Sequence, residues 1–129
     1  MTRKAPPSRT PSHRQHRVGE LIRHTLAELF ARGACHDPEL AEARLTFTEV
    51  RMSPDLRHAR VYFRRLGRRD AASLLPALSR AQGFLRHAVA EAVQLKFAPE
   101  LHFEPDTALD RAEAIETLLR SSRVARDLH

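Results

Sequence analysis

Two neighbouring stretches with alternating apolar and polar side chains constrain the fold of this chain most strongly. They cover residues 45–52 and 58–66, and both are rich in the β-branched and aromatic residues that favour strands. The Ser53-Pro54-Asp55 sequence between them has the composition of a turn. The pattern predicts an antiparallel hairpin with one apolar face and one face that carries arginines.

Helical periodicity precedes the hairpin. Apolar residues recur at helical spacing over residues 18–30, which predicts an amphipathic helix with one stripe facing a core. Ser12 and Gln15 have the spacing of an N-terminal capping box, and Gly33 stands where a left-handed residue ends a helix. We interpret the Asp-Pro pair at positions 37–38 as a turn that leads into the first strand.

A second and longer helical pattern follows the hairpin, over residues 74–93. Pro76 is tolerated only in a first turn, which favours Ser73 over Asp70 as the cap. Gly83 lies inside the pattern and costs about 1 kcal/mol relative to alanine, so it indicates either a kink between two helices or a close backbone approach.

A short strand over residues 100–105 and a last amphipathic helix over 108–119 complete the pattern. The expected order is helix, strand, strand, broken helix, strand and helix. This order predicts an α+β fold with helices packed on one face of a three-stranded sheet.

The 129 residues fit one domain, which we expect at 13–119. Residues 1–12 are basic and Pro-rich and are predicted to be a disordered arm, although organellar transit peptides have a similar composition. Residues 120–129 form a short C-terminal tail. The single cysteine, Cys35, excludes an internal disulfide framework, and no apolar run approaches the roughly 20 residues of a membrane span. We therefore expect a cytoplasmic protein that contacts no membrane.

Charge is distributed unevenly along the chain. Residues 51–96 hold ten Lys or Arg against three Asp or Glu, whereas residues 97–119 hold six acidic residues against one arginine. All but two of the 22 Lys and Arg residues are arginine, whose planar guanidinium binds phosphate and stacks on bases, although a GC-rich genome would also favour arginine. The separation predicts one face for a polyanion such as structured RNA and another that faces away from it.

The predicted RNA-binding residues are the arginines of the hairpin, of the broken helix and of the start of the first helix. They are Arg14, Arg17, Arg57, Arg60, Arg64, Arg65, Arg68, Arg69, Arg80 and Arg86. Each could contact phosphate and fix position without reading sequence, but any one of them could equally be a solvated surface charge. Tyr62 and Phe84 could stack on bases, although packing against the core or its rim is the favoured interpretation for both.

The sequence holds no recognisable catalytic or metal-binding pattern. The glycines are too scattered for a phosphate-binding loop, and the eight histidines lack the spacing of known zinc motifs. Cys35, His36 and Asp37 offer a nucleophile, a base and an acid, but adjacency within a loop is not catalytic geometry. The chain is predicted to be no enzyme and to need neither a cofactor nor a metal ion.

Six local motifs occur in order, with compatible spacing, within residues 14–119. They are Arg17-Val18, Asp37-Pro38-Glu39-Leu40, Met52-Ser53-Pro54-Asp55-Leu56, Ala59-Arg60-Val61-Tyr62, Ala81-Gln82-Gly83-Phe84-Leu85-Arg86 and Pro99-Glu100-Leu101-His102-Phe103. In this combination the chain resembles the bacterial ribosome-binding factor A family, and its element order resembles the type II KH-like fold.

The resemblance implies a non-catalytic assembly factor that binds the free 30S ribosomal subunit, assists late maturation of 16S ribosomal RNA and matters for growth in the cold. It also implies that an interhelical kink, here Ala81-Gln82-Gly83, replaces the GxxG loop of true KH domains. The expected partners are the 30S subunit and its 16S RNA, and the chain itself is expected to be a monomer.

The sequence is also compatible with three other functions. A structural or hibernation-type ribosomal protein would stay with mature ribosomes instead of free small subunits. A small enzyme acting on RNA would require a catalytic set that the sequence does not display. A basic DNA-binding domain is disfavoured because paired strands occur without a helix-turn-helix pattern.

Overall fold

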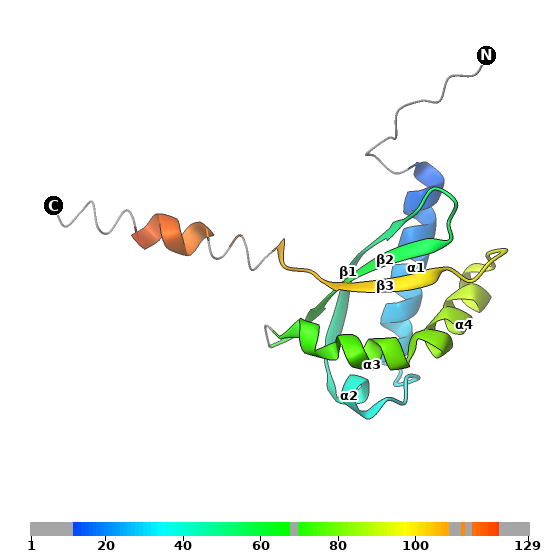
Figure 1. The fold of residues 1–129 in the computed structure, drawn as a ribbon, viewed down its shortest axis with the longest axis horizontal. Coiled ribbons are helices and arrows are strands. Elements are labelled where there is room, and N and C mark those ends of the chain that lie inside the picture. The colour runs from blue at the N-terminus through cyan, green and yellow to red at the C-terminus, as the bar shows by residue number, and fades with distance from the viewer. Residues whose placement is uncertain (1–11, 68–69, 109–111, 113–114, 122–129) are drawn as a thin grey trace, which may run out of the picture.

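A computed structural model describes residues 12–67, 70–108, 112 and 115–121. The elements are α1 (His13–Ala31), α2 (Pro38–Glu42), β1 (Leu45–Met52), β2 (His58–Arg65), the 3-10 turn η1 (Ala71–Leu74), α3 (Leu75–Arg80), α4 (Gln82–Val93) and β3 (Glu100–Pro105) (Figure 1). This order confirms the predicted α+β fold. The predicted arm and tail fall almost wholly outside the described residues, and their boundaries stay predictions.

The sheet has the order β1-β2-β3, with β1 antiparallel to β2 and β3 parallel to β2. The hairpin is therefore confirmed, and it carries a register shift between Phe47 and Glu49. Thr48 lies at this irregularity, and its hydroxyl donates a hydrogen bond of 2.6 Å to Oδ2 of Asp106, immediately after β3. The irregularity thus ties β1 to the end of β3 across the central strand.

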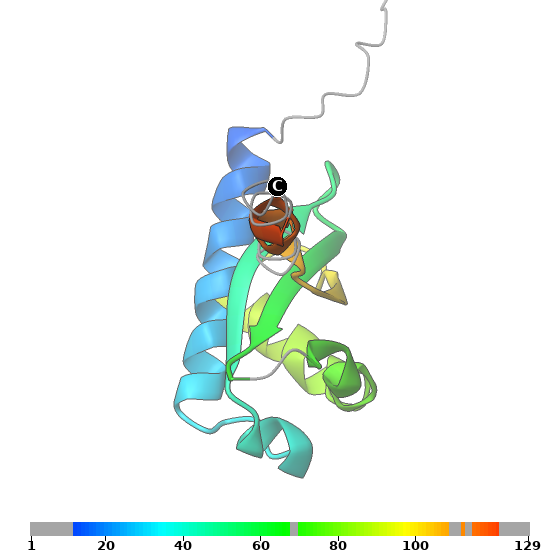
Figure 2. The same cartoon turned by 90° about the vertical axis from the view of Figure 1, so that its left-hand side faces the viewer.

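The core lies between one face of the sheet and the helices. Figure 2 shows α1 running along one side of the strands, and Ile22 and Leu26 of its apolar stripe are fully buried. Alternate residues of β2, among them Val61 and Phe63, are fully buried on the same side. Arg60 points the other way and is exposed, so the opposite face of β2 is open to solvent.

Gly19 sets how closely α1 approaches the sheet. A Cβ atom at this position would lie 2.4 Å from the backbone oxygen of Val50, a separation that backbone atoms cannot accommodate without moving. Only glycine fits at this crossing of α1 over β1. Gly19 was not among the residues that the sequence pattern predicted to shape the fold.

The predicted ends of α1 are confirmed. The Ser12 hydroxyl accepts from the Gln15 N–H at 3.1 Å, and the Gln15 side chain accepts from the Ser12 N–H at 2.9 Å. The Gln15 amide also donates to the backbone oxygen of Met52 at 2.9 Å, which joins the start of α1 to the end of β1. Gly33 has the expected left-handed conformation, with φ of 68°.

Two local predictions were incomplete or wrong. The Asp37-Pro38 pair does not make a simple turn, because Asp37 caps α2 by accepting from the Glu39 N–H at 3.0 Å. Ser73 does not cap the broken helix, since the 3-10 turn η1 begins at Ala71 and the Ser73 hydroxyl donates back to the Asp70 carbonyl. Pro76 does lie in the first turn of α3, as expected.

The helix break lies within the predicted Ala81-Gln82-Gly83 segment, at Ala81, between α3 and α4. Gly83 itself lies inside α4, and a Cβ at this position would meet nothing within 4 Å. The break is instead held by Gln82, whose side-chain amide donates to the Leu101 oxygen at 3.0 Å and accepts from the Leu101 N–H at 2.9 Å. Gln82 thus joins the break to β3.

The last predicted helix is present at residues 112 and 115–121 of the described chain. Its apolar residues Ile115, Leu118 and Leu119 are more than half exposed, so they do not pack into the core. None of the helices in the described part of the chain has the length and apolar character required to span a bilayer.

Candidate nucleic-acid interface

The expected separation of charges in space is wrong for the sheet. β3 belongs to the acidic segment of the sequence, but it pairs in parallel with the arginine-bearing strand β2. A carboxylate oxygen of Glu104 therefore lies 3.5 Å from Nε of Arg60. Charges that are distant in sequence are neighbours in the fold, because the sheet brings the two segments together.

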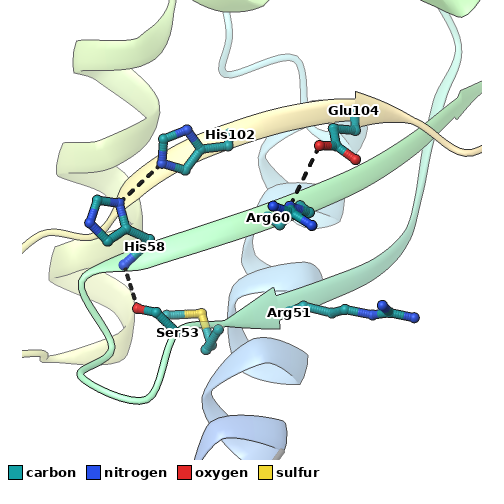
Figure 3. A pocket seen from close by; sticks show the side chains of 7 residues that line it. Arg51, Ser53, His58, Arg60, His102 and Glu104 are labelled. Carbon is teal, nitrogen blue, oxygen red and sulfur yellow. Dashed lines mark hydrogen bonds and ion pairs between the residues drawn. The ribbon is translucent and has the colours of Figure 1, made fainter. Parts of the chain in front are cut away.

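The open face of the sheet carries a pocket of about 460 Å³ (Figure 3). Its lining residues are Arg51, Met52, Ser53, His58, Arg60, His102 and Glu104. A hydrogen bond with Tyr62 and the charge of Glu104 raise the pKa of Arg60. Nε of Arg51 lies 2.7 Å from the Glu49 carboxylate, and its guanidinium lies 5.6 Å from the centre of the Tyr62 ring. This pocket holds charges of both signs, and its two arginines already have carboxylate partners.

The arginines near the helix break are also engaged. Arg80 contacts Asp37 at 3.1 Å and Glu39 at 3.0 Å, so its pKa is raised and the Asp37 pKa is lowered by the Arg80 hydrogen bond. Arg86 donates from Nε to the Pro99 oxygen at 3.2 Å and from Nη2 to the Ala98 oxygen at 3.1 Å. Both arginines therefore already have partners within the fold.

Four of the predicted arginines, Arg64, Arg65, Arg68 and Arg69, lie at the end of β2 or directly after it in the sequence, and they fall into three groups. Arg65 lies 3.5 Å from the Asp70 carboxylate and donates to the Ser73 hydroxyl at 3.2 Å. Arg64 is half-buried, and its charge contributes to lowering the Asp106 pKa, after the hydrogen bonds from Thr48 and Ala108. The third group, Arg68 and Arg69, falls outside the described residues.

A different cluster forms at the hairpin end of the molecule, at the upper right of Figure 1. Arg14 at the start of α1, the turn between β1 and β2, and residues 95–97 after α4 line one pocket of about 320 Å³. The guanidinium of Arg57 lies 4.3 Å from the centre of the Phe97 ring, and the Lys96 ammonium lies 5.5 Å from the same point. We call Arg14, Arg57, Lys96 and Phe97 the hairpin-end surface.

Two left-handed residues position this surface. Leu56 has φ of 61° with its side chain buried, which fixes the turn and leaves the next residue, Arg57, exposed. Gln94 has φ of 56° and ends α4, so the chain changes direction just before Lys96 and Phe97. Non-glycine residues rarely adopt this conformation, and the two that do so among the described residues both lie beside the same cluster.

The cations of the hairpin-end surface are available to a ligand. Within the described ranges, Arg14, Arg57 and Lys96 form no ion pair, and all three are exposed. The nearby Asp55 carboxylate is occupied by the Ser53 hydroxyl at 2.6 Å and by the Arg57 N–H at 3.1 Å. Exposed guanidinium and ammonium groups around an aromatic ring are the combination that binds phosphates and stacks unpaired bases.

Only part of this surface was predicted from the sequence. Arg14 and Arg57 were among the predicted residues, whereas Lys96 and Phe97 were not, although the Phe97 side chain is 48% exposed. A basic residue beside an aromatic one in the linker between a helix and a strand was the signal that could have found them. Arg17 is exposed on α1, one helical turn from Arg14, and its predicted role stays a prediction.

Comparison with known proteins gives a consistent result. The family model described as ribosome-binding factor A matches residues 14–119. The ribosome-binding factor A of Parvibaculum lavamentivorans is 50% identical over 121 residues, which cover 94% of this chain and 86% of that protein. The protein of the same name from Afipia carboxidovorans is 53% identical over 118 residues, covering 92% and 84%.

Solved structures agree with the sequence matches. The crystal structure of ribosome-binding factor A from Thermus thermophilus matches with a TM-score of 0.59 and 33% identity, over 70% of this chain and 94% of that one. A homology model of the factor from the same organism, fitted into a cryo-EM map of its complex with the 30S subunit, matches with a TM-score of 0.57 and 33% identity, over 73% and 96%. The predicted KH-like fold is confirmed by these neighbours.

Proposed function

This chain belongs to the ribosome-binding factor A family, and from that premise we propose that it binds the free 30S ribosomal subunit and assists late maturation of 16S ribosomal RNA. A Thermus thermophilus homologue with 33% identity has been fitted into a map of its complex with the 30S subunit, which supports the choice of partner. The protein acts by binding, without catalysis, in the cytoplasm and as a monomer.

The hairpin-end surface carries the contact with ribosomal RNA. The observation that supports this assignment is the exposed Phe97 ring, which is flanked by the cations of Arg57 and Lys96. Phosphates bind the cations and set the orientation of the protein, whereas an unstacked base binds the ring. The predicted arginines of β2, α3 and α4, which already have partners, contribute less. Residues 13–119 form the RNA-binding domain.

The protein binds one conformation of the small-subunit RNA more tightly than the alternative conformations. This difference in affinity shifts the RNA toward the preferred conformation. An assembly factor of this kind needs no chemical step, because release of the protein completes its role. We expect loss of the protein to slow growth most strongly in the cold, as the family resemblance implies.

Sedimentation of the tagged full chain through a lysate gradient tests this function. An assembly factor is expected in the free 30S fractions, with precursor 16S RNA accumulating when the protein is depleted. The alternative, a structural or hibernation-type protein, would be found with 70S ribosomes. Recovery in the 70S fractions, or at the top of the gradient away from all subunits, would contradict the proposal.

A further inference from the structure

Two histidines and a glutamate meet on the open face of the sheet. They lie beside the hairpin-end surface, since His58 and Glu100 line a pocket together with Arg57 and Phe97. Nδ1 of His58 lies 3.1 Å from Nε2 of His102 and 3.6 Å from Oε2 of Glu100. One nitrogen of each histidine and one oxygen of Glu100 all lie within 4.8 Å of one another. Figure 3 shows the two imidazoles facing each other across β2 and β3.

The parallel pairing of β2 and β3 brings these residues together. His58 is opposite Glu100, and His102 lies two residues further along the same strand, so all three side chains point to the same face. The Ser53 hydroxyl accepts from the His58 N–H at 3.0 Å, and the Glu100 N–H donates to the Arg57 oxygen at 2.8 Å. These bonds fix the backbone from which His58 and Glu100 project.

Two of the three separations between the donor atoms match those of a tetrahedral transition-metal site, and the third is no more than 4.8 Å. With zinc bonds of about 2.0–2.1 Å, tetrahedral geometry separates two ligand atoms by about 3.3 Å. The observed separations of 3.1 and 3.6 Å lie on either side of this value. Two imidazoles and one carboxylate are also a donor set that zinc uses in proteins.

We propose that His58, Glu100 and His102 form a binding site for a divalent transition-metal ion of the zinc class. The side chains of His58 and Glu100 are each 54% exposed, so an ion reaches them without opening the fold. Three protein ligands leave one position for water or another oxygen ligand. Because the site is exposed, we expect it to bind more weakly than a buried four-ligand site.

The short distance between the imidazoles has a second explanation. In the free protein one ring can donate an N–H to the other, and zinc would replace the shared proton. The two states use the same nitrogens, so they exclude each other at any moment. The experiment must therefore distinguish a zinc site from a hydrogen-bonded histidine pair that has no affinity for metal.

Calorimetric titration of the metal-free full chain with Zn²⁺ at pH 7.5 tests the proposal. We expect one saturable site. His102→Gln and Glu100→Gln should each weaken it by about tenfold or more, because even the groups that support metal ligands contribute about 10- to 100-fold. His87→Gln is the matched control: His87 also lies beside a carboxylate, Glu91 at 3.4 Å, but has no third ligand among the described residues.

Thermal unfolding with and without Zn²⁺ provides a second readout. The ion should raise Tm for the unmodified chain and for His87→Gln, but not for His102→Gln. Saturation only above about 100 µM, or equal affinity in all variants, would overturn the proposal. Because the probe is the metal alone, a negative result leaves the proposed RNA contact unaffected.

Discussion

Arg57 and Arg80 are both arginines on the surface of the same small fold, yet their surroundings differ completely. Arg57, at the hairpin end, lies over the ring of Phe97 and has no carboxylate partner among the described residues. Arg80, beside the helix break, contacts Asp37 and Glu39. A phosphate can bind Arg57 directly, but it must displace two carboxylates to bind Arg80. The availability of a basic residue therefore depends on its neighbours in the fold as well as on its exposure.

Charge reversal at the two positions gives the largest expected difference. Arg57→Glu should weaken binding to the 30S subunit by about 10- to 100-fold, because it removes a phosphate contact and adds repulsion. Arg80→Glu should weaken binding by less than about threefold, while lowering Tm because Asp37 and Glu39 lose their partner. Quantitative 30S binding and circular dichroism measure the two effects. A stronger loss of binding in Arg80→Glu would reverse the comparison.

Removal of the aromatic ring should produce the next largest effect. Phe97→Ala is expected to weaken RNA binding by about 1–3 kcal/mol if one base stacks on the ring. Phe84→Ala is the matched control, since Phe84 is 45% exposed on α4 but is not part of the hairpin-end surface. Binding assays at several salt concentrations distinguish stacking from phosphate contacts, because loss of a stack leaves the salt dependence unchanged. Equal losses in the two variants would remove Phe97 from the interface.

Gly83→Ala should have a smaller effect, and it tests the helix break instead of the hairpin-end surface. The added methyl group meets open space, and alanine favours a helix over glycine by about 0.8–1 kcal/mol, so the free protein should become more stable. Affinity for the 30S subunit should not change if the helix break is outside the interface. Denaturant unfolding and 30S binding measure the two quantities. A more stable variant that no longer binds would place the RNA against the backbone of Gly83.

Lowering the pH should show how much the ion pair between Arg80 and Asp37 contributes to stability. Arg80 lowers the pKa of this carboxyl below its usual 3.8, so the pair stabilises the fold above that pH. This contribution is lost as the pH falls through the lowered value in the folded protein. Tm measured between about pH 2 and 6 should therefore fall less steeply in Asp37→Asn than in the unmodified chain. Parallel curves would indicate that the pair does not affect stability.

Local patterns predicted the elements well. The hairpin strands, the short strand at 100–105, the capping box of Ser12 and Gln15, and a helix break at 81–83 all follow from a few neighbouring residues. The physical cause of the break was wrong in part. Gly83 has room for a side chain, whereas Gln82 forms the bonds to β3 that hold the segment.

The long-range arrangement was less predictable. The sequence does not state that β3 lies parallel to β2, and this pairing places Glu104 beside Arg60 and His102 beside His58. The contact between His58 and His102, for example, joins residues that are 44 positions apart in the sequence. Charge counts along the chain therefore failed to predict which cations are available, and motif spacing failed to find a cluster assembled by the sheet.

Site-specific crosslinking tests the central comparison most directly. A photoreactive phenylalanine analogue placed at position 97 or at position 84 would be irradiated in the complex with the free 30S subunit. We expect crosslinks to 16S ribosomal RNA from position 97 and few or none from position 84. Efficient crosslinking from position 84, with none from position 97, would contradict the assignment of the RNA contact to the hairpin-end surface.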